Sequence, residues 1–255
     1  MDRLIYTALS GMANSMTRER VIASNMANAQ TIGFKAEVLN ATPMTLEGPQ
    51  LQVRAMSSAD VKGAMMKDGA VVNTGNPLDV ALSGDTMLAV QADDGGEAYT
   101  RRGDLSVTVT GVLQNGDGLP VIGQNGPITL PPGARITIGP DGALLMADPA
   151  VPEAPPARLD VMKLVSTTGS TITKTLAGQF RVPGDGIPGS PTEFGVLPVD
   201  ANARLIPQSL EQSNVNASEV LVEMISAQRL FDLRTKLIET ARQLDEGGTR
   251  LMRLD

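Results

Sequence analysis

The distribution of proline and glycine divides this chain more sharply than any other feature of its sequence. All 17 prolines fall between Pro43 and Pro207, and 23 of the 26 glycines lie between Gly33 and Gly195. Both residues interrupt α-helices, proline because it lacks a backbone N–H and glycine because of its conformational freedom. The sequence therefore predicts a helix at each end of the chain and a long region of strands and loops between them.

The C-terminal helix has a clear start signal in the stretch S-N-V-N-A-S-E-V. Asn216 can cap the helix, and Glu219 stands three residues later, as in a capping box. Val215 and Val220 occupy the positions of a hydrophobic staple. Apolar side chains then recur at helical spacing over about 30 residues, a length that suggests coiled-coil-like packing. We expect the glycine pair at 247–248 to end the helix.

The N-terminal helix carries an apolar stripe of its own. Ile5, Leu9, Met12 and Met16 recur at intervals of three or four residues. One interpretation of the two terminal stripes is that both helices face the core of a single globule. The other is that they pack against neighbouring copies, which is favoured by their terminal positions, their length and the long β-type region between them.

The middle of the chain has the pattern of short strands separated by turns. Glycine-rich turns such as D-D-G-G and N-G-D-G punctuate apolar or alternating runs. The stretch that precedes these runs lacks clear periodicity. We expect strands at 78–82, 87–91, 98–101, 105–109, 135–138, 143–146 and 159–165.

Composition lowers the expectation of an enzyme or a nucleic-acid binder. The chain has no cysteine and no histidine, so it lacks thiol nucleophiles, thiolate metal ligands and the commonest general base. Its formal net charge is −7, whereas a nucleic-acid-binding surface is basic. No run approaches the roughly 18 apolar residues of a membrane span. The N-terminus also lacks the charge and apolar core of a signal peptide, so we expect any export to retain it.

Three short motifs suggest chemistry but have simpler explanations. Residues 184–189 match G-x-G-x-x-G, but the nearby prolines forbid the helix that a dinucleotide site needs. Asp93 and Asp94 lack the spacing of a calcium loop and fit a hairpin turn. Lys174 follows several hydroxyl residues, but no S-x-x-K spacing occurs. The sequence therefore predicts no catalytic residue, cofactor or metal.

Stretches at both ends resemble the signatures of flagellar rod and hook proteins. S-N-M-A-N-A-Q-T-I-G-F-K (24–35) is similar to A-N-N-L-A-N-x-x-T-x-G-F-K of that family. S-N-V-N-A-S-E-V-L-V-E-M-I-S-A-Q-R-L-F (213–231) is similar to its S-N-V-N-x-x-E-E-M-V-x-M-I-x-A-Q-R-x-F/Y. The middle adds G-N-P-L-D-V-A-L-S-G (75–84), A-Y-T-R-R-G (98–103) and G-P-I-T-L-P-P (126–132). The resemblance covers nearly the whole chain, and its length and short connector are closest to the proximal rod members.

The resemblance implies an α+β fold with three parts. Residues 1–35 and 208–255 would pair as terminal helices in a coiled-coil-like inner assembly domain. Residues 36–75 would form an extended connector. Residues 76–207 would form a mostly antiparallel, all-β outer domain.

The resemblance also implies a structural function. The chain would be a subunit of the bacterial flagellar basal-body rod, in its proximal part, and would polymerise through its terminal helices into a hollow drive shaft that transmits torque. Its partners would be other copies, neighbouring proximal and distal rod proteins and the flagellar export apparatus, without nucleic acid or membrane insertion. It would lie in the periplasmic rod and would be exported, as a type III export substrate, without a cleaved signal peptide.

The implied assembly interface combines apolar helix positions with residues at the two helix ends. Amide side chains would make directional hydrogen bonds at a crowded junction without burying charge. Gly33 would permit the positive φ at which the chain leaves the helix, and Phe34 would be an apolar anchor. The expected interface residues are Ile5, Leu9, Met12, Met16, Asn25, Asn28, Gly33, Phe34, Asn214, Asn216, Val220, Met224, Ile225, Gln228, Phe231, Leu237 and Ile238.

Other functions remain open from the residues alone. The chain could be a distal rod or hook-family subunit. It could also be a secreted β-domain enzyme or adhesin whose helical ends serve for oligomerisation, or a soluble coiled-coil dimer. An enzyme would need converging acidic or nucleophilic groups between residues 76 and 200, and the sequence does not reveal such a set.

Overall fold

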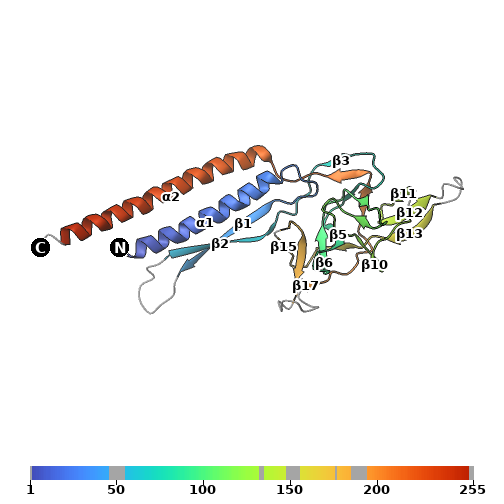
Figure 1. The fold of residues 1–255 in the computed structure, drawn as a ribbon, viewed down its shortest axis with the longest axis horizontal. Helices are drawn as coiled ribbons and strands as arrows, with labels where there is room; N and C mark the ends of the chain where they lie inside the picture. Colours follow the sequence, from blue (N-terminus) through green and yellow to red (C-terminus); the bar gives the residue numbers. More distant parts are fainter. Residues whose placement is uncertain are drawn as a thin grey trace. The chain divides into compact units, whose positions relative to one another are not determined.

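The computed structural model describes residues 2–45, 55–131, 135–147, 156–175, 177–184 and 194–252. The chain forms two compact units (Figure 1). The first, here called the helical unit, comprises Met1–Ala29, Glu37–Gly63 and Val215–Asp255. The second, the β unit, comprises Gln30–Ala36 and Ala64–Asn214. Helices at the ends and strands between them confirm the predicted α+β class.

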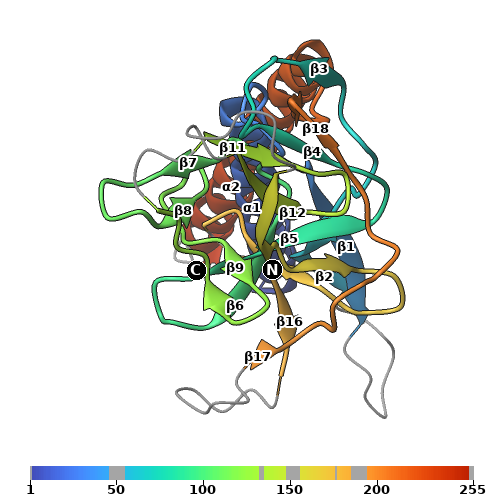
Figure 2. The same ribbon diagram turned by 90° about the vertical axis from the view of Figure 1, so that its right-hand side faces the viewer.

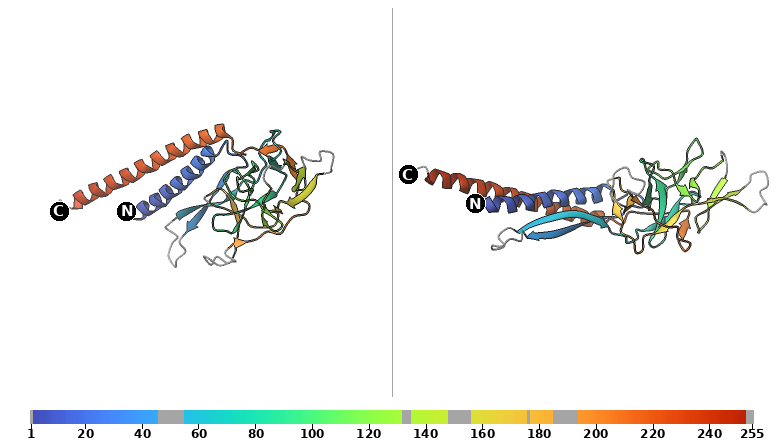
Figure 3. Two further views of the ribbon diagram at one scale, coloured as in Figure 1. Left: turned by 45° about the vertical axis from the view of Figure 1, so that its right-hand side comes forward. Right: turned by 90° about the horizontal axis from the view of Figure 1, so that it is seen from below.

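The helical unit is built on α1 (Asp2–Ala27) and α2 (Ala217–Met252). The two helices lie side by side and run in opposite directions, as the positions of the chain termini in Figures 1 and 3 show. Strands β1 (Glu37–Thr45) and β2 (Ala55–Ala64) pair with each other, and β1 packs along α1. The expected pairing of the terminal helices is therefore confirmed within one chain.

The start of α2 agrees with the capping prediction. The backbone N–H groups of Ser218 and Glu219 donate to Oδ1 of Asn216 at 3.1 and 3.5 Å, so its amide satisfies donors that the first turn leaves unpaired. The predicted end of the helix is wrong, because α2 continues through 247–248 to Met252. Glycine disfavours a helix interior by about 1 kcal/mol but does not forbid it. An added Cβ at Gly247 would meet nothing within 4 Å.

The stretch expected as an extended connector contains paired strands. Besides β1 and β2 it includes β3 (Val71–Asn73), which pairs with β19 (Ser209–Glu211) of the β unit. The side chains of β3 are all exposed, so the strand has no buried face that an apolar alternation would reveal. Its pairing depends on backbone hydrogen bonds, which hydrophobic periodicity does not report.

The β unit contains a six-stranded antiparallel sheet and several smaller antiparallel sheets, some of whose strands are labelled in Figure 2. The six-stranded sheet runs in the order β14-β5-β6-β16-β15, with β17 added to β16. Its strands are β5 (Thr86–Gln91), β6 (Glu97–Thr100), β14 (Leu164–Ser166), β15 (Thr173–Lys174), β16 (Phe180–Pro183) and β17 (Phe194–Gly195). The three-stranded sheet consists of β11 (Arg135–Ile138), β12 (Ala143–Ala147) and β13 (Ala157–Val161).

The remaining strands of the β unit form two-stranded antiparallel sheets. They are β4 (Val80–Leu82) with β18 (Leu205–Pro207), β7 (Ser106–Val107) with β8 (Leu113–Gln114), and β9 (Ile122–Gly123) with β10 (Gly126–Pro127). Each of the seven predicted strands overlaps an observed one, and the stretch 159–165 is divided between β13 and β14. The strand predictions are therefore confirmed, although the described part of the β unit contains nine further strands that the sequence did not predict.

Two of the three short motifs that suggest chemistry have structural explanations in the described residues. Asp93 and Asp94 form the turn of the β5–β6 hairpin, in which Gly95 N–H donates to Ala92 O at 2.8 Å. Most of the stretch 184–189 lies outside the described residues. Lys174 lies 3.5 Å above the centre of the Phe34 ring and donates to Lys35 O at 2.9 Å.

Candidate assembly interface

The facing sides of α1 and α2 form an apolar seam inside the subunit. Ile22, Val220 and Ala227 are buried there. Three partly buried side chains pack against them, namely Met26, Val215 and Met224. Of the predicted interface residues, Val220 and Met224 thus contribute to the contact between two helices of one chain.

A polar contact crosses the same seam. The Arg234 guanidinium donates hydrogen bonds to the carbonyl oxygen of Gly11 and to Oγ of Ser15. Ser15 is only 3 % exposed, so this contact is largely shielded from water. A polar contact in an otherwise apolar seam favours one register of the two helices, because any slip leaves buried donors and acceptors unpaired.

The outward side of α2 is also apolar. Ile225 lies two residues from the buried Ala227, which places it about 160° away around the helix axis. Ile225 is 51 % exposed, and four further large apolar side chains are comparably exposed. They are Leu221, Val222, Leu233 and Leu237. A water-facing helix normally presents polar residues on its outward side, so α2 has an apolar face that no described residue of the chain covers.

Helix α1 repeats this arrangement. Leu9 and Met16 are each 57 % exposed, whereas Ser15 and Ile22 are buried. Leu9 lies about 140° around the axis from Ile22, so the exposed stripe is on the side away from the seam. We call the exposed residues Leu9, Met16, Leu221, Val222, Ile225, Leu233 and Leu237 the outer stripes.

The other predicted helix residues divide between the two sides. Met12, Phe231 and Ile238 are half-buried, whereas Gln228 and Asn216 are exposed. The side chain of Ile5 lies outside the described part of the structure. The sequence stripes therefore combine positions that contact the other helix of the same chain with positions that face outward.

The amide side chains at the end of α1 bind within the helical unit. Asn25 Nδ2 donates to Glu37 O at 3.1 Å, and Glu37 N–H donates to Asn25 Oδ1 at 2.8 Å. Ser24 Oγ donates to Glu37 Oε1 at 3.0 Å. Asn28 Nδ2 donates to Ser24 O at 2.9 Å and so satisfies a carbonyl of the last helical turn. The directional role expected of these amides is found inside the subunit, and contacts of theirs with a neighbour stay a prediction.

Gly33 and Phe34 are buried in the β unit. Gly33 has φ +67°, as expected, and a Cβ there would lie 2.4 Å from Arg101 O. Only glycine allows both this conformation and this close approach. Phe34 is 9 % exposed and is covered by the cationic side chain of Lys174.

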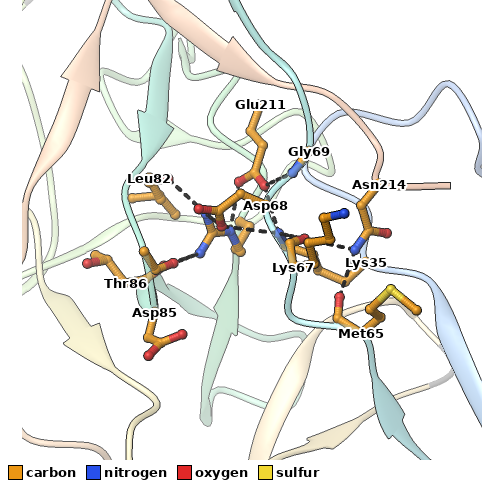
Figure 4. Close-up of polar contacts among 12 residues, drawn as sticks. Lys35, Met65, Lys67, Asp68, Gly69, Leu82, Asp85, Thr86, Glu211 and Asn214 are labelled. Atoms are coloured by element: carbon orange, nitrogen blue, oxygen red, sulfur yellow. Dashed lines mark hydrogen bonds and ion pairs between the residues drawn. The ribbon is translucent and has the colours of Figure 1, made fainter.

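Asn214 ties the start of the C-terminal segment to two other segments of the β unit. Its Oδ1 accepts a hydrogen bond from Ala36 N–H at 2.8 Å. Its Nδ2 donates to Met65 O at 2.7 Å and to Lys67 O at 2.9 Å (Figure 4). The side-chain amide of Asn214 therefore joins three chain segments through hydrogen bonds to backbone groups, as the backbone of a paired strand would.

A buried ion cluster beside this amide was not anticipated from the sequence. Glu211 Oε1 accepts from Lys35 Nζ at 2.7 Å and from Gly69 N–H at 2.8 Å (Figure 4). Glu211 Oε2 accepts from Arg101 Nε at 2.7 Å. Lys35, Arg101 and Glu211 are each 1 % exposed, whereas Asp68 is about half exposed and also pairs with Arg101. The formal charges of the four side chains sum to zero.

The guanidinium of Arg101 is fully paired in this cluster. Each of its five N–H groups has an acceptor, which is the condition for burying it without a large desolvation penalty. The acceptors are Glu211 Oε2 at 2.7 Å, Asp68 Oδ1 at 3.0 Å, and the carbonyl oxygens of Leu82 at 2.8 Å, Thr86 at 3.2 Å and Gly84. Burial lowers the pKa of Lys35 below its usual range, an effect that its hydrogen bond to Glu211 opposes.

Comparison with known proteins assigns the chain to a family. Three family models match: a flagella basal body rod protein model at residues 5–35, a flagellar hook protein FlgE/F/G D1 domain at 81–146, and a flagellar basal body rod FlgEFG C-terminal domain at 206–251. FlgF of Escherichia coli K12 is 40 % identical over 240 residues, which cover 94 % of each chain. The chain belongs to the flagellar basal-body rod protein family. FlgF of Salmonella typhimurium is 37 % identical over 99 % of both chains, whereas FlgG of Bacillus subtilis is 29 % identical over 96 % and 97 %.

The matched segments of this rod-family chain coincide with the features described above. The N-terminal match covers most of α1 and extends to Lys35, and the C-terminal match includes Glu211 and nearly all of α2. The middle match includes Arg101. The identities of 40 % and 37 % to two FlgF proteins over nearly the full chain make it a FlgF-like rod protein. No helix in the described ranges has the length and apolar character required to cross a membrane.

Proposed function

We propose that this protein is a structural subunit of the proximal flagellar rod, and that it polymerises through the outer stripes of its terminal helices into a hollow shaft that transmits torque. The observation that carries the proposal is the presence of apolar faces on α1 and α2 directed away from their mutual seam. A helix that is apolar on two opposite sides is typical of a buried position in a larger assembly.

The energetics of the outer stripes favour association. Seven large apolar side chains, each roughly half exposed, remain to be covered. Burying the exposed half of such a side chain is worth roughly 1 kcal/mol, so one set of stripes offers about 5–8 kcal/mol before the entropic cost of association. Repeated contacts along a filament would add to this value for each new subunit.

The remaining parts have complementary proposed roles. The helical unit would form the inner assembly domain and the β unit the outer domain, with Glu37–Gly63 belonging to the inner domain. Partners would be copies of this chain, the neighbouring proximal and distal rod proteins and, during delivery, the export apparatus. Delivery to the periplasmic rod would not require removal of an N-terminal signal.

Two substitutions that introduce a negative charge into the outer stripes test the proposal. Leu9→Asp and Ile225→Asp place a carboxylate where a neighbouring subunit would pack, and an unpaired buried carboxylate costs several kcal/mol. In the isolated subunit both positions are more than half exposed, so its fold should persist. We expect neither variant to enter basal bodies purified from cells that lack the native copy, and we expect such cells not to swim.

The matched control is Val109→Asp, because Val109 is a fully exposed apolar residue of the β unit. It should enter rods at the parental level, as measured by immunoblot of purified basal bodies. Parental incorporation of both outer-stripe variants would overturn the proposed mode of assembly.

A further inference from the structure

The chain passes between its two units four times. The crossings lie at 29–30, 36–37, 63–64 and 214–215. Three segments of the β unit adjoin them, here called the exit segments: 33–36, 65–69 and 211–214. The exit segments are far apart in sequence. The contacts that join them therefore determine how closely the adjoining ends of α1 and α2 are held together.

The exit segments hydrogen-bond to one another within the β unit. Gly33 N–H donates to Glu211 O at 2.8 Å, and Asn214 N–H donates to Phe34 O at 3.3 Å. Met65 N–H donates to Ala36 O at 2.8 Å. Together with the amide bonds of Asn214, these contacts pair each exit segment with the other two.

The ion cluster connects the exit segments to the sheets of the β unit. Each exit segment contributes one charged member, namely Lys35, Asp68 or Glu211. The fourth member, Arg101, follows β6 and donates hydrogen bonds to the carbonyl oxygens of Leu82 and Thr86, on either side of the β4–β5 turn. Lys35 Nζ also donates to Lys67 O at 2.8 Å, so it joins two exit segments by itself.

We propose that Lys35, Asp68, Arg101 and Glu211 form a clamp that holds the two terminal segments together in the β unit and thereby promotes the pairing of α1 with α2. Five residues separate Ala27, the end of α1, from Gly33, and five separate Glu211 from Ala217, the start of α2. A flexible chain of this length spans only about 12–15 Å. The clamp therefore holds α1 and α2 within this short distance of each other, although they lie at opposite ends of the sequence. This raises the effective concentration of one helix with respect to the other.

The clamp explains why a rod-family subunit would bury charge at this position. Apolar packing alone would hold the exit segments together but would allow them to slide past one another. The five hydrogen bonds of the Arg101 guanidinium are directional, so they are all satisfied only when the segments lie in one relative position. The inference concerns the single chain and does not rest on the proposed function, so its failure would leave the rod assignment untouched.

The effective concentration of the two helices can be measured with introduced thiols. Because the chain has no cysteine, a variant with Met26→Cys and Val220→Cys has only these two thiols, so the only intramolecular disulfide it can form joins α1 to α2 across the seam. Its equilibrium with glutathione reports how strongly the chain favours helix pairing. We expect Lys35→Met in this background to lower the effective concentration by about tenfold or more.

The matched control is Lys163→Met, which removes the Lys163–Glu97 ion pair elsewhere in the β unit, where both side chains are 13 % exposed. We expect it to leave the effective concentration within about twofold of the parent. An equal fall in both variants would assign the effect to general loss of stability and would overturn the clamp. Parental behaviour of Lys35→Met would overturn it as well.

A charge-balanced variant covers the case in which Lys35→Met does not fold. Lys35→Met with Glu211→Gln leaves Arg101 paired with Asp68 and no net charge in the cluster. We expect backbone amides of 33–36 and 211–214 to exchange with solvent about tenfold faster in this variant, with those of β5 and β6 unchanged. Parental exchange in the exit segments, or equally faster exchange in β5 and β6, would contradict the clamp.

Discussion

The side-chain amide of Asn25 exchanges two hydrogen bonds with the backbone of Glu37, as two paired residues of a β-sheet do. The amide of Asn25 both donates to Glu37 O at 3.1 Å and accepts from Glu37 N–H at 2.8 Å. Asn25 is 8 % exposed, so this exchange takes place largely away from water. It joins the last turn of α1 to the first residue of β1 inside the helical unit.

Replacement of this amide should destabilise the helical unit. Asn25→Leu leaves a backbone donor and a backbone acceptor of Glu37 without their partner, at a cost of about 1–3 kcal/mol. Asn40→Leu, on the exposed side of β1, is the control and should change the free energy of unfolding by less than about 0.5 kcal/mol. Chemical denaturation followed by far-ultraviolet circular dichroism measures both values. Equal effects of the two substitutions would show that the bidentate pair contributes nothing specific.

Gly33 should be far less tolerant of substitution than another glycine of similar conformation. Gly33→Ala incurs about 1–2 kcal/mol for a left-handed backbone, and its Cβ would also press against Arg101 O at 2.4 Å. Gly84 has φ +57° but no atom within 4 Å of an added Cβ. Gly84→Ala therefore isolates the conformational cost, and we expect Gly33→Ala to lower the free energy of unfolding by at least about 2 kcal/mol more. Similar losses in both variants would contradict the close approach.

The helices were predictable because their signals are local. The Asn216 cap, the Val215–Val220 pair and the absence of proline all act within a few residues of one another. The periodicity did not separate the inner seam from the outer stripes, because it identifies apolar positions without identifying what covers them. The end of α2 was mispredicted for a related reason: a glycine pair weakens a helix but stops it only where another conformation is more stable.

The ion cluster could not be read from the sequence. Lys35 and Glu211 are 176 residues apart, and a charged residue met singly is normally exposed. The short strands that were missed, such as β15 and β17, have two residues each and carry no periodicity. The one available signal was that Lys35 and Arg101 stand inside the two family-like motifs G-F-K and A-Y-T-R.

Tyr99 should make the β unit sensitive to alkaline pH. Burial raises the pKa of its phenol above the usual 10.0, and the hydroxyl oxygen accepts a hydrogen bond from Leu197 N–H at 2.7 Å. Because the folded state retains this proton when the unfolded state loses it, the contribution is complete below pH 10 and declines by up to about 1.4 kcal/mol per pH unit above it.

Tyr99→Phe is the test of that assignment. At pH 7 it should cost about 1–3 kcal/mol, because the buried Leu197 N–H loses its acceptor. The loss of stability above pH 10 should become shallower in the variant, as measured by urea unfolding at a series of pH values. Parallel profiles for parent and variant would exclude Tyr99 as the source of the alkaline sensitivity.

The acidic turns of the β unit distinguish a structural role from catalysis. Asp94 and Asp117 form ion pairs with Arg181 and Arg102, and both carboxylates are more than a third exposed. Asp→Asn at either position, or at Asp93 or Asp141, retains an acceptor for the turn and should cost less than about 1 kcal/mol. We expect each variant to assemble and to support parental swimming speed. Loss of motility in a variant that still enters the rod would indicate a reactive carboxylate.

Photo-crosslinking from the outer stripes tests the central claim most directly. A photoreactive amino acid is placed at Met16 or at Ile225, both more than half exposed in the single chain, and basal bodies are irradiated before mass spectrometry. We predict adducts that join either position to the terminal helices of a second rod-family subunit, and their absence when the same purified chain is irradiated unassembled. Intact rods that contain the labelled chain but yield no intersubunit adduct from either position would contradict assembly through these faces.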